Sequence, residues 1–416
     1  MLHNFIISIV FIVLVTSCNL PVQTSDPVPS RKPLAVATNT LKIDPMEEIV
    51  NEVNRSAAPT ASILPPPTLT AQPTEASEGK PVYISADDAR IRYNGRFDFS
   101  DPQHPIYDWS GITIEAAFSG SSLSIVLKDG FNFYNVTVDG HSEILQTIPE
   151  ETTYIVAQDL PDEPHVIRLT KRTEAYVGAG VFSGLILEAG HDLLEKPAHA
   201  ERYIEFVGDS ITTGYGNEGD SPTCWFTAGT QNVAQSFAGQ TADHFNADYS
   251  IVALSGLGVV RNLRSAEASS PETAVDFLDR SLAMNHVLTW DQQNRFPDAV
   301  VVNLGTNDFS SLPFPEVEPF VEGYVELLQQ IRLRYPQAPV FALAGPLMLE
   351  PAPEVIRTAV ERMSLMGNSQ NVHFVLIEDT LDKSAVDFGC DWHPNVHGHR
   401  KIAEQLVPVM ADVLDW

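Results

Sequence analysis

Three short segments of the chain carry a serine, an asparagine and a histidine that could together hydrolyse an ester. Ser210 lies in the string Gly-Asp-Ser-Ile, directly after the apolar run at 203–207. Asn307 follows a second apolar run at 299–302, and His393 lies in Asp-Trp-His-Pro near the C-terminus. A serine hydroxyl attacks a carbonyl only when a neighbouring base removes its proton. Ser210 is therefore the candidate nucleophile and His393 the candidate base.

Attack on an ester places negative charge on the carbonyl oxygen, which fixed hydrogen-bond donors must stabilise. The N–H of Ser210, the N–H of Gly256 and the side-chain amide of Asn307 are suited to that role. Gly256 lies in Ser-Gly-Leu-Gly and, without a Cβ, can bring its backbone close to a substrate. Gly258 is the alternative donor.

Each of these residues also has a purely structural interpretation. Ser210 could cap a helix, Asn307 could hold an Asx turn, Gly256 could serve a tight turn, and His393 could lie in a surface loop. All four interpretations would have to hold together to remove the catalytic one. We therefore predict a serine esterase.

Asp391 is the candidate acid that would orient His393. In an extended segment, residues i and i+2 point to the same side, which would place Asp391 beside the imidazole rather than behind it. The alternative is that a backbone carbonyl holds the histidine tautomer, leaving a Ser–His dyad.

A metal site is the competing interpretation of His393, His397 and His399. Histidines at i and i+4 on a helix are a zinc spacing, but Pro394 interrupts any helix through His393, and no glutamate lies between His393 and His397. We expect no metal and no cofactor, with His397 and His399 beginning the last helix.

Strand–helix alternation over residues 200–416 predicts an α/β domain that positions these residues. Short, continuously apolar strands between helices are typical of a parallel sheet covered on both faces. Functional side chains collect beyond the carboxyl ends of such strands. We predict strands at 203–207, 249–254, 299–304, 340–343 and 373–377, and helices at 232–245, 317–335, 353–366 and 396–413.

Residues 81–195 show short alternating runs separated by turn residues, which predicts a jelly-roll β-sandwich. The runs are at 112–118, 123–127, 133–138, 153–156, 166–169 and 181–187. Trp109 alone does not predict sugar binding by this domain, and packing against the α/β domain is the preferred interpretation.

The N-terminal 80 residues predict export rather than a folded domain. Residues 1–18 form a lipoprotein-type signal peptide whose apolar stretch ends in Val-Thr-Ser-Cys, so that Cys18 would carry the lipid. A plain secretory signal is the alternative, because Met-Leu-His-Asn at the start has no Lys or Arg. Residues 19–80 form a Pro/Thr-rich linker with one short helix predicted at 41–53. We expect an exported protein, lipid-anchored at a bacterial cell surface or else periplasmic or extracellular.

The charge excludes one class of partner. The chain has 54 acidic and 25 basic residues, a formal net charge of −29. Nucleic acid needs a basic surface, so it is not expected as a partner, and a polyanionic polymer is disfavoured. A neutral substrate is preferred, although the charge could simply keep an exported protein soluble.

With Cys18 lipidated, two of the three cysteines remain, Cys224 and Cys390. Cys224 lies 14 residues after Ser210 and Cys390 three residues before His393, and export permits disulfides, so we predict a disulfide that joins the two catalytic loops. Two unpaired, buried thiols are the alternative.

The order Ser, Gly, Asn, His at the ends of α/β repeats resembles the SGNH (GDSL-type) hydrolases. Together with the sandwich, the strings Ile-Arg-Tyr-Asn-Gly-Arg at 91–96, Gly-Asp-Ser-Ile-Thr-Thr-Gly-Tyr-Gly at 208–216 and Gly-Cys-Asp-Trp-His-Pro at 389–394 resemble carbohydrate esterase family 2. The resemblance covers roughly 330 residues. It implies acetylxylan or acetylglucomannan esterase activity with a preference for 6-O-acetyl groups.

The aromatic residues near these loops suit a cleft that holds sugar. Trp392 and Trp225 are the first expected substrate contacts, followed by Phe309, Phe226 and Asp209. Packing of the loops is the alternative role for each ring. Two other functions remain open: a lipase or thioesterase of the same fold acting on longer acyl chains, and a catalytically silent carbohydrate-binding surface protein.

Overall fold

The computed structural model describes residues 79–290, 295–366 and 371–416. The predicted signal peptide, Cys18, the helix predicted at 41–53 and nearly all of the linker lie outside the described residues. In the part that is described, no helix is long and apolar enough to cross a membrane.

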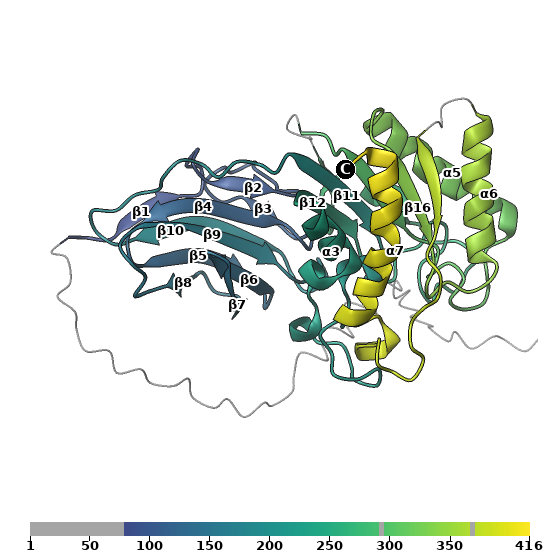
Figure 1. Cartoon of the computed structure of the whole chain (residues 1–416), viewed down its shortest axis with the longest axis horizontal. Helices are drawn as coiled ribbons and strands as arrows, with labels where there is room; N and C mark the ends of the chain where they lie inside the picture. Colours follow the sequence, from purple (N-terminus) through teal and green to yellow (C-terminus); the bar gives the residue numbers. More distant parts are fainter. Residues whose placement is uncertain (1–78, 291–294, 367–370) are drawn as a thin grey trace, which may run out of the picture. The chain divides into compact units, whose positions relative to one another are not determined.

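The first part of the described chain is a β-sandwich of two antiparallel sheets (Figure 1). One sheet has the order β1-β10-β5-β8 with β3 paired to β10, and the other has the order β2-β4-β9-β6-β7. Most connections pass from one sheet to the other, as in a jelly roll. The strands are β1 (Val82–Ser85), β2 (Arg92–Asn94), β3 (Ile106–Tyr107), β4 (Thr113–Ser119), β5 (Leu123–Asp129), β6 (Phe133–Val138), β7 (His141–Gln146), β8 (Thr152–Ala157), β9 (Pro164–Lys171) and β10 (Gly180–Leu187).

The alternating pattern explains which sandwich strands were predictable. In β9, Ile167 and Leu169 are buried while Val166 and Arg168 are exposed, as expected for a strand with one face on a core. Strand β7 was not predicted, because it lies at a sheet edge and nearly all of its side chains are exposed. An edge strand without a buried face leaves no apolar alternation in the sequence.

The second part of the chain contains a five-stranded, entirely parallel sheet with the order β12-β11-β15-β16-β17. Its strands are β11 (Arg202–Gly208), β12 (Ala247–Ala253), β15 (Ala299–Asn303), β16 (Val340–Ala344) and β17 (Val372–Leu376). Its helices are α2 (Ser210–Thr213), α3 (Phe237–His244), α4 (Ala274–Phe277), α5 (Val317–Arg334), α6 (Ala352–Leu365) and α7 (Val396–Leu414), with 3₁₀ turns at Ala228–Thr230, Val233–Gln235 and Cys390–Trp392. The predicted fold class is confirmed.

Both faces of the parallel sheet are covered, which explains its continuous apolar strands. In β15, Val300 and Val302 join the core cluster that contains α5 and α6, whereas Val301 joins the cluster that contains α3 and α7. The sandwich core is continuous with the first of these clusters. Trp109 belongs to it, is 1 % exposed and donates through Nε1 to the Ser281 carbonyl (3.1 Å), so it packs between the domains.

One predicted helix begins later than expected, and one hairpin was not predicted. The helix predicted at 232–245 is wrong at its start, because Val233–Gln235 is a separate 3₁₀ turn and α3 begins after Ser236. The Ser236 hydroxyl accepts a hydrogen bond from the Gly239 N–H (3.4 Å) and so caps the helix there. A hairpin of β13 (Arg280–Leu282) and β14 (Asn285–Thr289) was not predicted.

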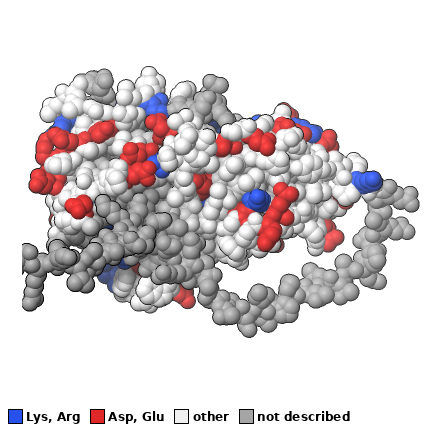
Figure 2. All heavy atoms as spheres, turned by 180° about the vertical axis from the view of Figure 1, so that it is seen from behind, with Lys and Arg blue, Asp and Glu red and all other residues white. Residues whose placement is uncertain are grey.

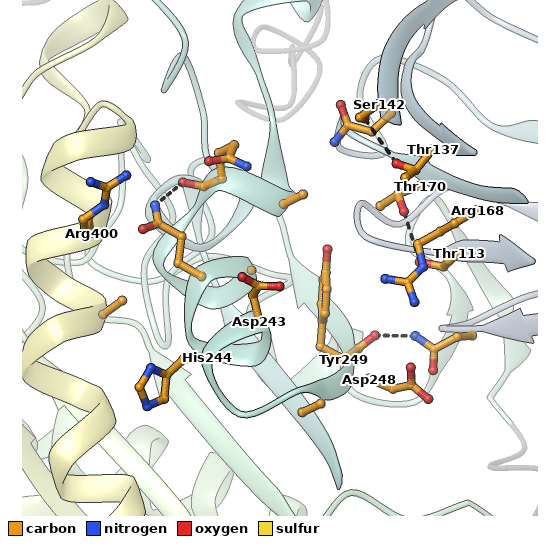
Figure 3. Close-up of a pocket in the computed structure, with 18 of the residues that line it drawn as sticks. Thr113, Thr137, Ser142, Arg168, Thr170, Asp243, His244, Asp248, Tyr249 and Arg400 are labelled. Atoms are coloured by element: carbon orange, nitrogen blue, oxygen red, sulfur yellow. Dashed lines mark hydrogen bonds between the residues drawn. The ribbon is translucent and has the colours of Figure 1, made fainter. Parts of the chain in front are cut away.

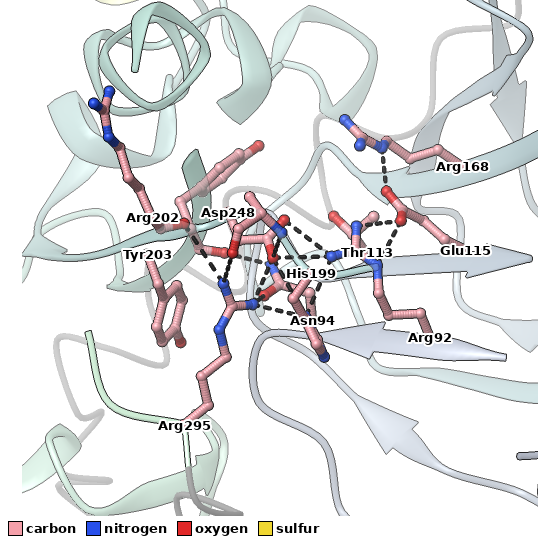
Figure 4. Close-up of polar contacts among 12 residues, drawn as sticks. Arg92, Asn94, Thr113, Glu115, Arg168, His199, Arg202, Tyr203, Asp248 and Arg295 are labelled. Carbon is pink, nitrogen blue, oxygen red and sulfur yellow. Dashed lines mark hydrogen bonds and ion pairs between the residues drawn. The ribbon is translucent and has the colours of Figure 1, made fainter. Parts of the chain in front are cut away.

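A network of charged side chains joins the sandwich to the start of β12 (Figure 4). Arg92 is 2 % exposed, and its Nη1 and Nε donate to Asp248 Oδ2 (2.9 Å) and Glu115 Oε2 (2.6 Å), respectively. Arg295 and His199 also contact Asp248.

The surface of the protein is acidic: Figure 2 shows many Asp and Glu side chains on one face and few Lys or Arg side chains.

Strand order places the functional residues at one edge of the sheet. Strand β11 lies between β12 and β15. The chain therefore passes from β11 to its neighbour β12 on one side, and the next strand, β15, pairs with β11 on the other side. Ligands of open α/β sheets bind outside the carboxyl ends of strands at such a switch point. Ser210 directly follows β11, and Asn307 follows β15.

Candidate active site

Ser210 lies at the sharp turn from β11 into the short helix α2. Asp209 caps this helix, accepting a hydrogen bond from the Ile211 N–H (3.0 Å). Gly208 permits the turn, because a Cβ at that position would lie 2.0 Å from Thr212 Oγ1. The Gly-Asp-Ser string therefore has a steric reason for its first residue and a capping reason for its second.

His393 meets Ser210 across 183 residues of chain. Its Nε2 lies 2.9 Å from Ser210 Oγ, and its Nδ1 lies 3.1 Å from the Asp391 carbonyl oxygen. A carbonyl can only accept, so Nδ1 carries the proton and Nε2 has a free lone pair for the serine proton. Burial lowers the pKa of His393, although the Asp391 carbonyl and carboxylate oppose this shift. The imidazole is therefore neutral near pH 7, as a general base must be.

The carboxylate of Asp391 is hydrogen-bonded to groups other than the His393 imidazole. Its Oδ2 accepts hydrogen bonds from the Tyr215 hydroxyl (3.1 Å) and the Phe226 N–H (3.1 Å). The expectation that Asp391 orients the imidazole through its carboxylate is thus corrected: the contact with His393 is made by the backbone carbonyl. The reason is local, because Asp391 and Trp392 are left-handed (φ 52° and 59°) rather than extended.

A disulfide between Cys224 and Cys390 ties the histidine loop to the segment after the nucleophile. Two backbone hydrogen bonds reinforce the link, from Asp391 N–H to the Cys224 carbonyl (3.1 Å) and from Trp392 N–H to the Pro222 carbonyl (3.2 Å). The left-handed pair before His393 is therefore held to residues 222–224 by the disulfide and by two backbone hydrogen bonds.

The candidate oxyanion donors differ in how free they are. Gly256 has φ 82°, a conformation that favours glycine, and no acceptor for its N–H occurs among the described residues. The Gly258 N–H donates to Asn262 Oδ1 (2.9 Å), so the alternative donor is already occupied. Asn307 Nδ2 donates to Asp209 Oδ2 (3.1 Å) and to the Leu257 carbonyl (2.9 Å). A substrate oxyanion would compete with these two acceptors for the amide of Asn307.

Asp308 was not singled out in the sequence, yet it shapes the loop that contains Gly256. Its buried carboxylate accepts hydrogen bonds from three successive N–H groups, those of Val259 (3.0 Å), Val260 (2.8 Å) and Arg261 (2.8 Å). Its position directly after Asn307 is the only signal that could have found it.

Two of the residues expected to contact substrate are buried. Asp209 is 0 % exposed and binds Ile211 and Asn307, and burial raises its pKa to about 7. Phe309 is 1 % exposed and packs on Phe320, with ring centroids 4.9 Å apart. The expectations for Asp209 and Phe309 are corrected: the first supports the nucleophile turn, and the second belongs to the core.

The two tryptophans are the exposed aromatic residues of these loops. Trp225 is 77 % exposed and Trp392 is 52 % exposed, next to the disulfide partners Cys224 and Cys390 respectively. Phe226, by contrast, is buried and stacks on Tyr215 at 4.2 Å between centroids. The exposed rings are therefore available to a ligand, and Phe226 supports the loop.

The other histidines have structural partners. His399 is fully buried and accepts a hydrogen bond from the Phe237 N–H (3.1 Å), and burial lowers its pKa to about 3. His397 Nδ1 lies 2.6 Å from Asp387 Oδ1. In the described segments, no group of three or more His, Cys, Asp or Glu side chains could hold a metal.

A separate groove of about 840 Å³ lies between the sandwich sheet that contains β9 and the helices α3 and α7 (Figure 3). Tyr249 stands in it, with Thr170 on the sandwich side and Asp243 and His244 on the helix side. Neither Ser210 nor His393 lines this groove.

Comparison with known proteins agrees with this site. Residues 93–197 match the family model "Carbohydrate esterase 2 N-terminal", and residues 206–401 match "GDSL-like Lipase/Acylhydrolase family". The fold and these matches define a carboxylic ester hydrolase of the SGNH, or GDSL, type.

Similar proteins identify the branch. A solved family two carbohydrate esterase from Clostridium thermocellum, in complex with cellohexaose, is 34 % identical and matches 78 % of this chain and 99 % of its own, with a TM-score of 0.73. The chain belongs to carbohydrate esterase family 2.

Two curated proteins are also similar. Cellulase/esterase CelE of Acetivibrio thermocellus is 35 % identical over 79 % of this chain but only 40 % of that protein. An acetylxylan esterase / glucomannan deacetylase of Cellvibrio japonicus is 28 % identical over 74 % of this chain and 86 % of the protein. The chain thus spans less than half of the first relative and most of the second.

Proposed function

We propose that this esterase removes O-acetyl groups from a plant cell-wall polysaccharide, xylan or glucomannan, through an acetyl-serine intermediate. The observation that carries the proposal is the 2.9 Å contact between Ser210 Oγ and His393 Nε2, with Nδ1 held by the Asp391 carbonyl. This is the geometry of an activated serine nucleophile.

In the first half of the reaction, His393 Nε2 takes the serine proton as Ser210 Oγ attacks the acetyl carbonyl carbon. The N–H groups of Ser210 and Gly256 stabilise the oxyanion. The side-chain amide of Asn307 does so as well when the oxyanion replaces Asp209 or the Leu257 carbonyl as its acceptor. The C–O bond to the sugar then breaks, and the sugar oxygen leaves with the proton from His393.

In the second half, His393 takes a proton from water as the water attacks the acetyl-serine. The same donors stabilise the second oxyanion, acetate leaves, and Ser210 regains its proton. No redox or metal chemistry is needed, because each step transfers only a proton and an acyl group.

The substrate assignment is supported by the two exposed tryptophans and by the acidic chain. Flat rings such as those of Trp225 and Trp392 can pack on the apolar faces of sugar rings, and a net charge of −29 favours a neutral polymer. The names of the relatives point to the same substrate class: one is an acetylxylan esterase / glucomannan deacetylase, and another was solved with cellohexaose.

We also propose that the protein is exported and held at the cell surface by a lipid on Cys18. The string Val-Thr-Ser-Cys supports this, as does the Pro/Thr-rich linker that follows it. Such a tether would let the catalytic part reach a large polymer outside the cell. Metabolic labelling with a fatty acid, compared between the parent and Cys18→Ala, tests the anchor.

Acetate release from acetylated xylan, acetylated glucomannan and acetylated pectin tests the function. We expect release from the first two, little from pectin, and none above background with Ser210→Ala. A parallel assay compares acetyl with octanoyl esters, since a lipase or thioesterase would prefer the longer chain. Preference for octanoate, or a Ser210→Ala variant as active as the parent, would refute the proposal.

A further inference from the structure

The end of strand β9 carries charged residues from the sandwich into the hydrolase domain. Lys171, Arg172 and Thr173 are 0 % exposed, and Glu174 is 2 % exposed. Arg172 Nε donates to the Gln231 carbonyl (3.1 Å), so this segment is buried against the chain that follows the nucleophile helix. Buried charges are rare unless they are paired and hydrogen-bonded, and here three of four successive residues are both charged and buried.

The carboxylate of Glu174 is bound almost entirely by residues of the other domain. Oε2 accepts a hydrogen bond from the Ser255 N–H (2.7 Å), and Oε1 accepts from Ser255 Oγ (2.6 Å) and from Gln231 Nε2 (3.3 Å). Ser255 directly precedes Gly256, the candidate oxyanion donor. Ser255 is thus held through both its backbone and its side chain.

The two hydrogen bonds between Ser255 and Glu174 restrict the direction of the Gly256 N–H. The direction of that N–H depends on the φ and ψ angles of Ser255 alone once the Ser255 N–H is fixed. The Ser255 hydroxyl also donates to Glu174, so the side chain of Ser255 is held as well as its N–H. A carboxylate makes these two contacts through different oxygens, whereas an amide in its place has only one acceptor oxygen and an apolar side chain has none.

The same carboxylate is connected to the turn that carries the nucleophile. Gln231 Nε2 donates to Glu174 Oε1 (3.3 Å) and also to the Thr213 carbonyl (3.3 Å), at the end of α2. Glu174 therefore links the loop with the oxyanion donor to the helix that begins at Ser210. Burial raises the pKa of Glu174, and the hydrogen bonds from Ser255 and Gln231 oppose that shift.

We propose that Glu174 is a positioning residue for the esterase reaction, supplied by the sandwich domain, which holds Gly256 in register with Ser210. The sandwich thus completes the active site rather than only packing against it. The inference rests on the proposed function in one respect: Gly256 must stabilise the oxyanion.

A second buried carboxylate of the sandwich provides a matched control. Asp108 is also 2 % exposed and also accepts hydrogen bonds from the hydrolase domain, in its case two, from the N–H groups of Ala283 (2.8 Å) and Met284 (2.9 Å). These residues belong to the β13–β14 hairpin and not to a catalytic loop. Glu174→Gln and Asp108→Asn remove the same charge from the same kind of interdomain contact.

The test measures kcat, KM and thermal unfolding of both variants on 4-nitrophenyl acetate. We expect Glu174→Gln to lower kcat about tenfold with KM within about twofold, a fraction of the 10²–10³ that loss of a whole oxyanion donor causes. We expect both variants to lower the unfolding temperature by similar amounts. Asp108→Asn should nevertheless leave kcat within about twofold of the parent. The inhibition constant of methylboronic acid, whose tetrahedral adduct uses the oxyanion donors, should rise with Glu174→Gln and not with Asp108→Asn.

A second variant keeps the test decisive if Glu174→Gln folds poorly. Ser255→Ala removes the hydroxyl contact and keeps the N–H contact, so it should lower kcat by a smaller factor. Combined with Glu174→Gln, it should add less than its separate effect, because both changes act on one contact.

Equal loss of kcat in Asp108→Asn and Glu174→Gln, or unchanged kcat in Glu174→Gln, would overturn the inference. Failure of the proposed function looks different. A parent that cleaves 4-nitrophenyl acetate through Ser210 but deacetylates no polysaccharide loses its proposed substrate, while the Glu174 comparison stands as measured.

Discussion

The sandwich domain contacts the hydrolase domain at both ends of β12, and the two contacts differ in kind. At the start of the strand, Arg92 binds Asp248 and Glu115 in a network of side-chain charges. Beyond the end of the strand, Glu174 binds the backbone and hydroxyl of Ser255. The first contact joins charge to charge, whereas the second joins one carboxylate to a loop of the active site.

The difference follows from the direction of a parallel sheet. All five strands point the same way, so the loops that carry Ser210, Gly256 and Asn307 lie at the carboxyl edge. A contact at the opposite edge, where the strands begin, can stabilise the fold without reaching these loops. We call this the amino edge of the sheet. We therefore expect substitutions at the carboxyl edge to change kcat and those at the amino edge to change stability.

Removing the base at the carboxyl edge should have the largest effect. His393→Ala leaves Ser210 without a proton acceptor, and we expect kcat to fall by about 10⁴-fold or more. Steady-state hydrolysis of 4-nitrophenyl acetate measures it. His397→Ala is the control, because that ring is half exposed and pairs with Asp387 instead. Retention of a tenth of the parent activity by His393→Ala would remove His393 from the mechanism.

Breaking the network at the amino edge should act on stability alone. Arg92→Met removes the buried partner that Glu115 and Asp248 share and leaves them with Arg168 and Arg295, and we expect a loss of up to about 3 kcal/mol in the free energy of unfolding. Urea unfolding measures this loss, with kcat taken at a temperature where the variant is folded. Arg90→Met, which removes a partly exposed ion pair within the sandwich, should change stability by only about 1 kcal/mol or less. A lower kcat in folded Arg92→Met would contradict the division between the two edges.

Asp391→Asn tests whether the backbone carbonyl or the side-chain carboxylate of Asp391 orients His393. Because the contact with His393 Nδ1 is made by the backbone, we expect kcat to fall by less than about tenfold. A loss of about 10⁴, as expected for an orienting carboxylate, would show that the side chain acts directly on the imidazole. Tyr215→Phe, which removes one donor to the same carboxylate, should have a smaller effect still.

The pH dependence should show the smallest change. His393 must be neutral to accept the serine proton, so activity is lost as the pH falls through its pKa. Burial lowers that pKa, and we expect the acid limb of kcat/KM to have its midpoint below about 6.5, the ordinary value for histidine. The Asp391 charge raises the pKa of His393, so Asp391→Asn should move the limb slightly further down. A midpoint above 6.5 in the parent would be inconsistent with a desolvated ring.

Much of the hydrolase domain was predictable because its signals are local. The strands of the parallel sheet are buried on both faces and so appear as continuous apolar runs. The predicted strand at 299–304 agrees with β15 (Ala299–Asn303), and the one at 340–343 agrees with β16 (Val340–Ala344), each to within a residue. The helix at 232–245 was placed too early, because the apolar pattern continues through the 3₁₀ turn before Ser236.

The site was predictable in its residues and less so in their directions. The distance between Ser210 and His393 agrees with their predicted partnership, since both follow recognisable strings at the ends of elements. Asp209 and Phe309 were expected in the cleft but are buried, because burial depends on what packs over a loop. The carbonyl of Asp391 rather than its carboxylate contacts the His393 ring, because two left-handed residues replace the extended backbone that the spacing argument assumed.

By itself, the sequence indicated the class of enzyme, an ester hydrolase, because a serine, a glycine, an asparagine and a histidine at strand ends suit acyl transfer. Tertiary structure alone decided how those groups are held. The Asp391 carbonyl faces His393 because a disulfide and a left-handed pair turn the loop. Glu174 reaches Ser255 across 81 residues and a domain boundary, a contact that no local pattern encodes because it exists only when the two domains pack together.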